Sequence, residues 1–264
     1  MQNLNMYSLC LYERHYSIIK NLRYIPVGLG KNKFNKNWLR DNTGLNISKK
    51  NPFYGEYTFH YWLWKNMLSS FNNNTWVGFC GYRYFWKQKK NEKNSIHNVL
   101  QKVPDEWNNY EAIIADPQVI NNIKFSKILK NGSPLLLFNY RAYLKKKQNI
   151  NFHFQVFHGK NSLDNAIDLL DEDNREPFRD YVNKNYSFHK WNMFVCRSPK
   201  KISEYYKSIF KWLNKCEKIF GFNLEGYGQK RMYGFLAERY LSYWFTKNTK
   251  YLSWPVFKLD IDQA

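Results

Sequence analysis

The segment 76–86, Trp-Val-Gly-Phe-Cys-Gly-Tyr-Arg-Tyr-Phe-Trp, restricts the fold more than any other feature of the chain. It is an almost continuous apolar and aromatic run, and it lies between an Asn-rich and a Lys-rich segment. A run of this kind predicts a central strand that is covered on both faces of its sheet. The two glycines, Gly78 and Gly81, indicate that another group approaches the strand closely.

Other short apolar runs along the chain alternate with helical patterns. Strands are predicted at 6–12, 24–29, 110–115 and 189–197, and helices at 52–70, 161–170, 175–183, 198–221 and 229–247. No element is predicted for the basic segment 121–148. Strands that alternate with helices predict an α/β fold. No repeat or long linker divides the sequence, so we expect a single domain over residues 1–264.

The charge of the chain restricts its partners. With 41 Lys and Arg against 21 Asp and Glu, the net charge is +20, which favours an anionic partner. Nucleotide phosphates, a lipid-linked pyrophosphate, an anionic membrane surface or a nucleic acid would all satisfy it. The basic residues are spread along the sequence and no nucleic-acid motif is present, so nucleic-acid binding is the weaker alternative.

The cysteines and apolar segments indicate the compartment. Cys10, Cys80, Cys196 and Cys216 form no CxxC pair, and buried free thiols are expected. The first residues contain too short an apolar run for a signal peptide, and no stretch approaches the ~20 apolar residues of a membrane span. These features predict a cytoplasmic location. No GxGxxG, P-loop or nucleophile elbow is present, so nicotinamide, kinase and hydrolase functions have no support.

Several segments, taken in order, form one pattern: 24–28, 39–48, 51–58, 61–66, 77–85, 157–164, 189–197 and 234–241. This pattern resembles a bacterial exopolysaccharide-synthesis family long catalogued as a domain of unknown function, which includes the galactofuranosyltransferase domain of O-antigen polymerases. The chain departs from the family in one strand: it has Cys80-Gly-Tyr-Arg-Tyr-Phe, where the family often has a His and a paired Arg-Arg.

The resemblance implies a glycosyltransferase-A-like fold, a single α/β domain with a central, mostly parallel sheet flanked by helices. Residues 1–120 would form the nucleotide-sugar donor half, and residues 121–264 the acceptor half with the C-terminal helices. The implied reaction moves a sugar, such as galactofuranose, from a UDP-sugar to a lipid-linked capsular or surface polysaccharide by single-displacement inversion. The protein would then work peripherally on the anionic inner face of the plasma membrane. An inactive scaffold of a polysaccharide synthesis complex is the alternative.

Candidate donor residues fall in three segments. Arg40 and Arg83 offer guanidinium groups that match phosphate oxygens, although either is also consistent with an ordinary surface Arg. Glu56, one turn into a predicted helix, is expected to accept a hydrogen bond from a sugar hydroxyl, but the helix dipole alone would also favour it. The polar loop that follows Arg40 suits hydroxyl recognition or a tight turn. With the resemblance, the donor set also includes Asp41, Asn42, Asn46, Ser48 and Tyr82.

The candidate catalytic base is Glu238, because its apolar helical context would raise its pKa toward the working pH. A buried ion pair with some other Arg or Lys is the structural alternative, since the neighbouring Arg239 is expected to point to another side of the helix. Asp116, which ends a predicted strand before Pro117, is the second candidate.

The remaining candidates concern the acceptor and a metal. His158, His189, Trp191 and Asn192 are predicted acceptor-side or structural residues, because their spacing matches no zinc pattern. A divalent cation such as Mg or Mn stays an alternative, but the Asp-x-Asp matches at 171–173 and 260–262 are poorly placed for one. No metal ligand is therefore predicted, and basic side chains are expected to take the cation's role.

Overall fold

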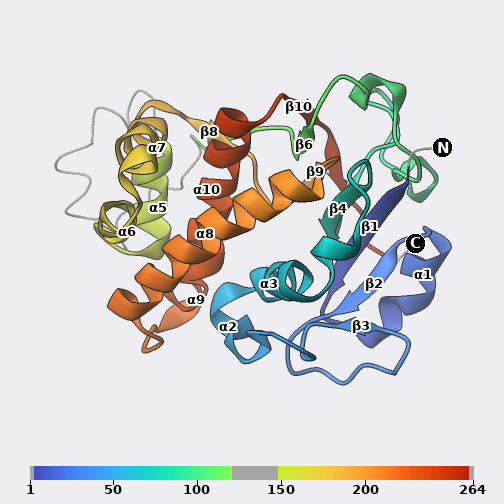
Figure 1. Cartoon of the computed structure of the whole chain (residues 1–264), viewed down its shortest axis with the longest axis horizontal. Coiled ribbons are helices and arrows are strands. Elements are labelled where there is room, and N and C mark those ends of the chain that lie inside the picture. The colour runs from blue at the N-terminus through green and yellow to red at the C-terminus, as the bar shows by residue number, and fades with distance from the viewer. Residues whose placement is uncertain (1–2, 121–147, 262–264) are drawn as a thin grey trace.

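The computed structural model of the chain describes residues 3–120 and 148–261 (Figure 1). The segment 121–147, for which the sequence predicts no element, lies outside the described residues. Helices alternate along the chain with the strands of a central sheet, so the predicted α/β class is confirmed.

The sheet is mixed and mostly parallel. Its strands follow the order β10-β6-β9-β4-β1-β2-β3, and β5 and β11 extend it beside β4. β9 alone on this path is antiparallel to its neighbours, β4 and β6. A separate small sheet pairs β7 with β8. The strands are β1 (Leu4–Cys10), β2 (Ile25–Gly28), β3 (Leu39–Arg40), β4 (Trp76–Gly81), β5 (Tyr84–Trp86), β6 (Ala112–Ala115), β7 (Gln118–Val119), β8 (Ser187–Phe188), β9 (Phe194–Cys196), β10 (Tyr251–Trp254) and β11 (Val256–Lys258).

Long helices pack beside the sheet, and α8 and α10 contact each other (Figure 1). α8 begins where the sequence predicts, because the Ser198 side chain accepts a hydrogen bond from the Lys201 N–H and Pro199 suits the first turn. The helices are α1 (Tyr16–Asn21), α2 (Asn51–Tyr54), α3 (Tyr57–Asn66), α5 (Ile150–His158), α6 (Ser162–Asp168), α7 (Glu172–Lys184), α8 (Pro199–Phe220), α9 (Gly226–Lys230) and α10 (Met232–Asn248). Short 3₁₀ turns lie at 13–15, 48–50, 68–70, 96–98 and 105–107.

Both faces of the sheet are buried, as the apolar run predicts. Alternate residues of β1, β4, β6 and β9 enter two different hydrophobic clusters: Val77 and Phe79 of β4 join one, while Trp76 and Cys80 join the other. Gly78 permits the close packing of β4 against its neighbours, since a β-carbon there would lie closer than 3.0 Å to the side chains of Met6 and Val195. All four cysteines are buried and free, which confirms that prediction.

Several predicted elements differ from the structure. The run 76–86 is a hairpin of β4 and β5 with its turn at Tyr82 and Arg83, because Gly81 pairs with Tyr84. The predicted helix 52–70 is interrupted at Gly55, whose φ of +57° and ψ of −131° are not helical. The strands predicted at 6–12 and 24–29 are joined by helix α1, which the sequence did not predict, and they pair in parallel.

The structure also contains elements that the sequence did not predict, among them α5, β10 and β11. The strand predicted at 189–197 is reduced to β9, because the residues before it form a turn. Among residues 3–120 and 148–261, no helix is both long and apolar enough to cross a bilayer.

Candidate active site

The candidate site lies at the edge of the sheet where the carboxyl ends of β1, β2 and β4 meet. Because β9 runs antiparallel to β4, with Val77 beside Cys196, its amino end reaches the same edge. The turn before β9 therefore faces the hairpin turn after β4. Ligands of open α/β sheets bind in crevices outside the carboxyl ends of the strands, so this edge is the expected place for a site.

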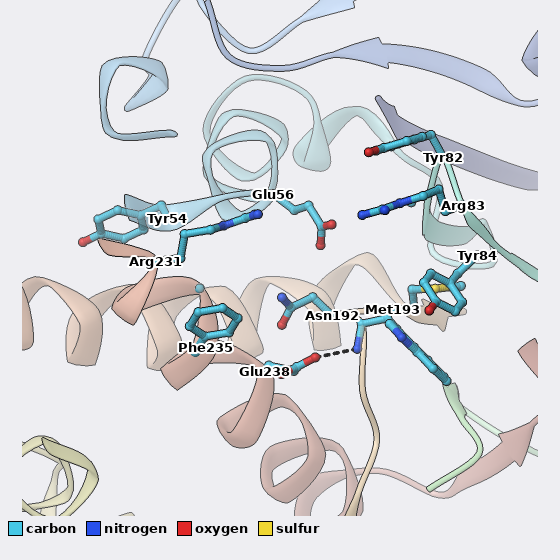
Figure 2. A pocket seen from close by; sticks show the side chains of 13 residues that line it. Tyr54, Glu56, Tyr82, Arg83, Tyr84, Asn192, Met193, Arg231, Phe235 and Glu238 are labelled. Atoms are coloured by element: carbon cyan, nitrogen blue, oxygen red, sulfur yellow. Dashed lines mark hydrogen bonds between the residues drawn. The ribbon is translucent and has the colours of Figure 1, made fainter. Parts of the chain in front are cut away.

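A cavity of about 180 Å³, here called the carboxylate cavity, opens at this edge (Figure 2). Two carboxylates, two guanidinium groups and a set of aromatic rings reach it from α2 and the residues between α2 and α3, from the hairpin turn and β5, from the turn before β9, and from α10 and its start. Its lining residues are Tyr54, Glu56, Gly81, Tyr82, Arg83, Tyr84, Trp191, Asn192, Met193, Arg231, Gly234, Phe235 and Glu238.

A second cavity of about 200 Å³, the strand-end cavity, lies directly beside the first. It is built on the residues that follow β1 and β2, Leu11 and Leu29, and on Asn51 and Pro52 at the start of α2. The two cavities share one wall, which consists of Glu56, Tyr82, Arg83 and Arg231. A ligand that spans both cavities would therefore contact both guanidinium groups.

Glu56 provides the carboxylate of this shared wall. Its pKa is raised from 4.5 to about 7: burial raises it most, Arg231, Asn192 and Arg83 lower it, and the nearby Glu238 raises it. Figure 2 shows the Glu56 carboxylate turned into the cavity, with the Arg83 side chain directed toward it. A carboxyl group with a pKa near neutrality is suited to proton transfer at physiological pH.

Glu238, the second carboxylate of the carboxylate cavity, is fixed by hydrogen bonds to both of its oxygens. Its Oε1 accepts a hydrogen bond of 2.7 Å from the backbone N–H of Trp191, and its Oε2 accepts one of 2.6 Å from Nη1 of Arg239. Arg239 is only 2% exposed, and its guanidinium lies 4.5 Å from the ring centre of Phe188. The expectation that Arg239 points away from Glu238 is therefore wrong, because the two neighbours form a buried ion pair.

The turn before β9 has an unusual backbone. Trp191 and Asn192 adopt φ values of +73° and +52°, a left-handed conformation that costs non-glycine residues on the order of 1–3 kcal/mol each. The bond to Glu238 holds this turn, and so does the Trp191 ring, which stacks on Tyr84 with centroids 4.7 Å apart. As a result, the Asn192 side chain enters the cavity between Glu56 and Glu238 (Figure 2). Its Oδ1 is buried without a hydrogen-bond partner in the described structure.

Arg231 reaches the site from the start of α10 and packs over Gly55. A β-carbon on Gly55 would lie closer than 3.0 Å to Nη2 of Arg231, so the glycine is needed for this approach as well as for its own positive φ. Arg83 is exposed on the hairpin turn, and its guanidinium lies 5.0 Å from the ring centre of Tyr82. The two cations thus come from opposite sides of the shared wall.

Six of the predicted site residues line the carboxylate cavity: Glu56, Tyr82, Arg83, Trp191, Asn192 and Glu238. Sequence reasoning missed Arg231, Tyr54, Tyr84, Met193, Gly234 and Phe235. Nothing local distinguishes Arg231 from other cations, because it follows Lys230 at a helix start and its partners are far away in the sequence. The signal that was available is Gly55, since a glycine beside Glu56 in a predicted helix indicates a break or a close approach.

The predicted donor loop 40–48 lines neither cavity. Arg40 instead donates hydrogen bonds to the carbonyls of Gly30 (3.0 Å) and Asn32 (3.3 Å). The Asn46 Oδ1 accepts from the Ser48 backbone N–H and hydroxyl, so the loop closes on itself. Asn42 is exposed, and Asp41 is buried, with a pKa that burial raises.

Three other candidates also lie outside both cavities. His158 is buried and its Nδ1 hydrogen-bonds the Gly228 carbonyl at 2.8 Å, while burial lowers its pKa to about 3. His189 is buried as well, and its Nδ1 bonds the carbonyl of Ala115. Asp116 is half-buried at the end of β6, where burial raises its pKa and Lys90 and His189 oppose the change. The two histidines support the surrounding backbone, and none of the three residues lines either cavity.

The described residues of the two Asp-x-Asp matches do not line either cavity. Asp171 precedes α7 and forms ion pairs of 3.1 Å with Lys211 and Lys215, which hold its pKa below the usual range. The second match includes Asp262, which lies outside the described residues. Within the described parts of the chain, no group of three or more His, Cys, Asp or Glu side chains is arranged to hold a metal ion.

A larger, open groove of about 1050 Å³ lies at the other end of the sheet, near Leu4 at the start of β1. Exposed side chains of both charges line it, among them Arg23, Lys102, Asp105 and Glu106. They do not converge on one point from separate elements, as the groups of the carboxylate cavity do. We therefore take the two smaller cavities as the candidate active site.

The fold is shared with a solved glycosyltransferase. The apo structure of the WbbM bifunctional glycosyltransferase matches with a TM-score of 0.68 and 19% sequence identity, over 98% of this chain and 45% of that one. The present chain thus spans less than half the length of that protein. The model of the family described as Domain of unknown function (DUF4422) matches residues 8–249, and the chain belongs to this family. A comparison with curated proteins finds no match.

Proposed function

We propose that the chain is a glycosyltransferase that moves a sugar from a nucleotide-sugar donor to a glycan acceptor. One observation carries the proposal: two carboxylates and two guanidinium groups converge on adjoining cavities at the carboxyl ends of parallel strands. Sugar transfer needs both, because cations stabilise the departing diphosphate and a carboxylate removes the proton of the acceptor hydroxyl. The fold shared with a glycosyltransferase supports the same function.

The strand-end cavity would take the nucleotide, and the shared wall its diphosphate. Arg83 and Arg231 offer forked donors that match phosphate oxygens, so they would perform the neutralisation that a metal cation performs in other enzymes. Most of this cavity comes from the first 120 residues, in agreement with a donor half there, although Arg231 is contributed by the later half.

The carboxylate cavity would hold the transferred sugar and the acceptor hydroxyl. Its aromatic wall of Tyr84 and Trp191 presents flat apolar faces of the kind on which sugar rings pack. Uridine as the base, a galactofuranose-type sugar, inversion of the anomeric centre and a lipid-linked capsular or surface polysaccharide acceptor follow from the family resemblance. The net charge of +20 suits a lipid-linked pyrophosphate at an anionic inner membrane.

The test is a thermal-shift and turnover screen of the purified protein against nucleotide-sugars, including UDP-galactofuranose, with and without Mg²⁺ or Mn²⁺. Stabilisation by UDP and slow donor hydrolysis are the expected results. Arg231→Gln should weaken UDP binding, whereas Arg175→Gln, on α7 away from both cavities, should not. If no nucleotide binds, the transferase proposal fails and the inactive-scaffold alternative takes its place.

A further inference from the structure

The two carboxylates of the carboxylate cavity differ in how they are bound. Both oxygens of Glu238 accept short hydrogen bonds, one from the Trp191 backbone and one from the buried Arg239. Glu238 is also the ion-pair partner of the buried Arg239, and removal of that partner would leave a buried charge unpaired. Both oxygens of Glu238 are therefore already engaged by the protein.

Glu56 lies in the shared wall, beside the cations that face the diphosphate. The charged groups around it are Arg231 and Glu238 from α10 and its start, and Arg83 from the hairpin turn. The neutral titratable groups near it are Cys80 of β4 and Tyr57 of α3, whose pKa values burial raises. Burial favours the neutral carboxyl group and the two guanidinium groups favour the anion, so the pKa of Glu56 lies at about 7 and the group can exchange a proton near neutral pH.

We propose that Glu56, and not Glu238, takes the proton of the acceptor hydroxyl, while Glu238 is a positioning residue that holds the Trp191–Asn192 turn. This inference rests on the proposed transferase function. In the step, the hydroxyl O–H bond breaks and its proton passes to a carboxylate oxygen of Glu56. The hydroxyl oxygen forms a bond to the anomeric carbon. The bond from that carbon to the phosphate oxygen breaks, and the nucleoside diphosphate leaves with the electron pair toward Arg83 and Arg231.

The orientation of Asn192 fits this assignment. An ionised carboxylate accepts hydrogen bonds but cannot donate them, so the amide of Asn192 turns its NH₂ toward Glu56. Its Oδ1 is then buried without a partner in the described structure and is available to accept from a second hydroxyl of the sugar. An acceptor hydroxyl next to the reacting hydroxyl would donate this hydrogen bond to Oδ1 of Asn192.

Donor binding should also strengthen the base. Arg231 and Arg83 lower the pKa of Glu56. A bound diphosphate neutralises both cations, so the pKa of Glu56 rises and the carboxylate holds an accepted proton more firmly. The donor would therefore bind before the acceptor is activated. The apparent pKa in the pH profile of kcat should be higher than the apparent pKa in the profile of kcat/KM for the donor.

The test compares Glu56→Gln, Glu238→Gln and the control Glu225→Gln, which removes an exposed carboxylate outside both cavities. UDP-galactofuranose hydrolysis and UDP binding are measured from about pH 5 to pH 9. Wild type, Glu225→Gln and Glu238→Gln should show a rate that rises with pH through a pKa near or above 7. Glu56→Gln should lose about 10²-fold or more in kcat, as expected for a lost general base. Its rate should no longer rise with pH, and it should still bind UDP.

Three outcomes separate the alternatives. Loss of the pH limb in Glu238→Gln, with its retention in Glu56→Gln, would overturn the assignment. If Glu56→Gln fails to fold, Glu56→Asp serves instead: it keeps a carboxylate one methylene shorter and should retain the pH limb at a lower kcat. A wild-type protein that binds no UDP would reject the proposed function itself, which is a different result from a wrong choice of base.

Discussion

Replacement of Gly55 by Ala tests whether the close approach of Arg231 matters. The residue has a φ of +57° and a ψ of −131°, so an alanine there is strained by about 1–3 kcal/mol. The new β-carbon would also lie closer than 3.0 Å to Nη2 of Arg231, and the guanidinium must move away. The chain offers a matched control in Gly221, with a φ of +63° and a ψ of −154° but no atom within 4 Å of the corresponding β-carbon.

Both variants should therefore lose similar stability, and only Gly55→Ala should also lose affinity for UDP. A drop of about 1–3 kcal/mol in the free energy of unfolding corresponds to a Tm lower by roughly 2–10 °C for a chain of this size. A hydrogen bond to a charged group contributes about 1.5–3 kcal/mol, so displacement of Arg231 should weaken UDP binding by about 10-fold or more.

The assays are differential scanning calorimetry for the Tm and isothermal titration calorimetry for UDP. A titration at low ionic strength avoids the loss of electrostatic affinity that salt would cause. Equal UDP affinity in Gly55→Ala and Gly221→Ala would refute the argument that Gly55 positions Arg231 for phosphate. Equal affinity with unequal Tm values would also show that the two glycines do not have the same backbone strain.

Three further predictions concern stability, each measured by urea denaturation. The pKa of Glu56 is raised from 4.5 to about 7, so the folded state binds more protons than the unfolded state between these values, and stability at this site falls as pH rises through them. Glu56→Gln removes that pH dependence. The stability of this variant relative to wild type should therefore increase by on the order of 3 kcal/mol between about pH 4 and about pH 7. A parallel pH dependence in both proteins would contradict the raised pKa. Gly78→Ala should lose about 1–3 kcal/mol because its β-carbon crowds Met6, and an unchanged urea midpoint would show that the neighbouring strand yields freely. Arg239→Met should lose about 3–5 kcal/mol, because Glu238 is left as a partly buried charge without its ion-pair partner. A loss below about 1 kcal/mol would contradict this expectation and would show that the anion finds another cation.

The sequence predicted the elements whose patterns are local. The apolar run at 76–86 indicated a strand buried on both faces, and Ser198-Pro199 marked the start of α8. The hairpin inside that run was missed because its turn residues, Tyr82 and Arg83, are not typical turn formers. β10 and β11 were missed because short strands at the end of a chain are identified mainly by the distant strands with which they pair.

The candidate site was predictable to the extent that its residues stand out locally. Glu56 and Glu238 are carboxylates within aromatic or apolar segments, and the structure brings both to one cavity. The loop at 40–48 contains equally suitable polar residues, but they bond to their own backbone and to each other. Arg231 depends on a contact with Gly55 that no local pattern describes. The catalytic roles of these residues stay predictions until the variants are measured.

The pairing of β10 with β6 and of β11 with β5 has a consequence for the synthesis of the protein. When only the first 120 residues have emerged from the ribosome, β1 to β6 are exposed, but β6 and β5 still lack the partners encoded at residues 251–258. Arg231 is also absent from such a nascent chain, so the shared wall of the two cavities is incomplete. Contacts between residues so far apart form late, and the exposed strand edges invite association with other chains until then. We therefore expect the nascent protein to need chaperone protection, and truncated translation products to be unable to bind a donor.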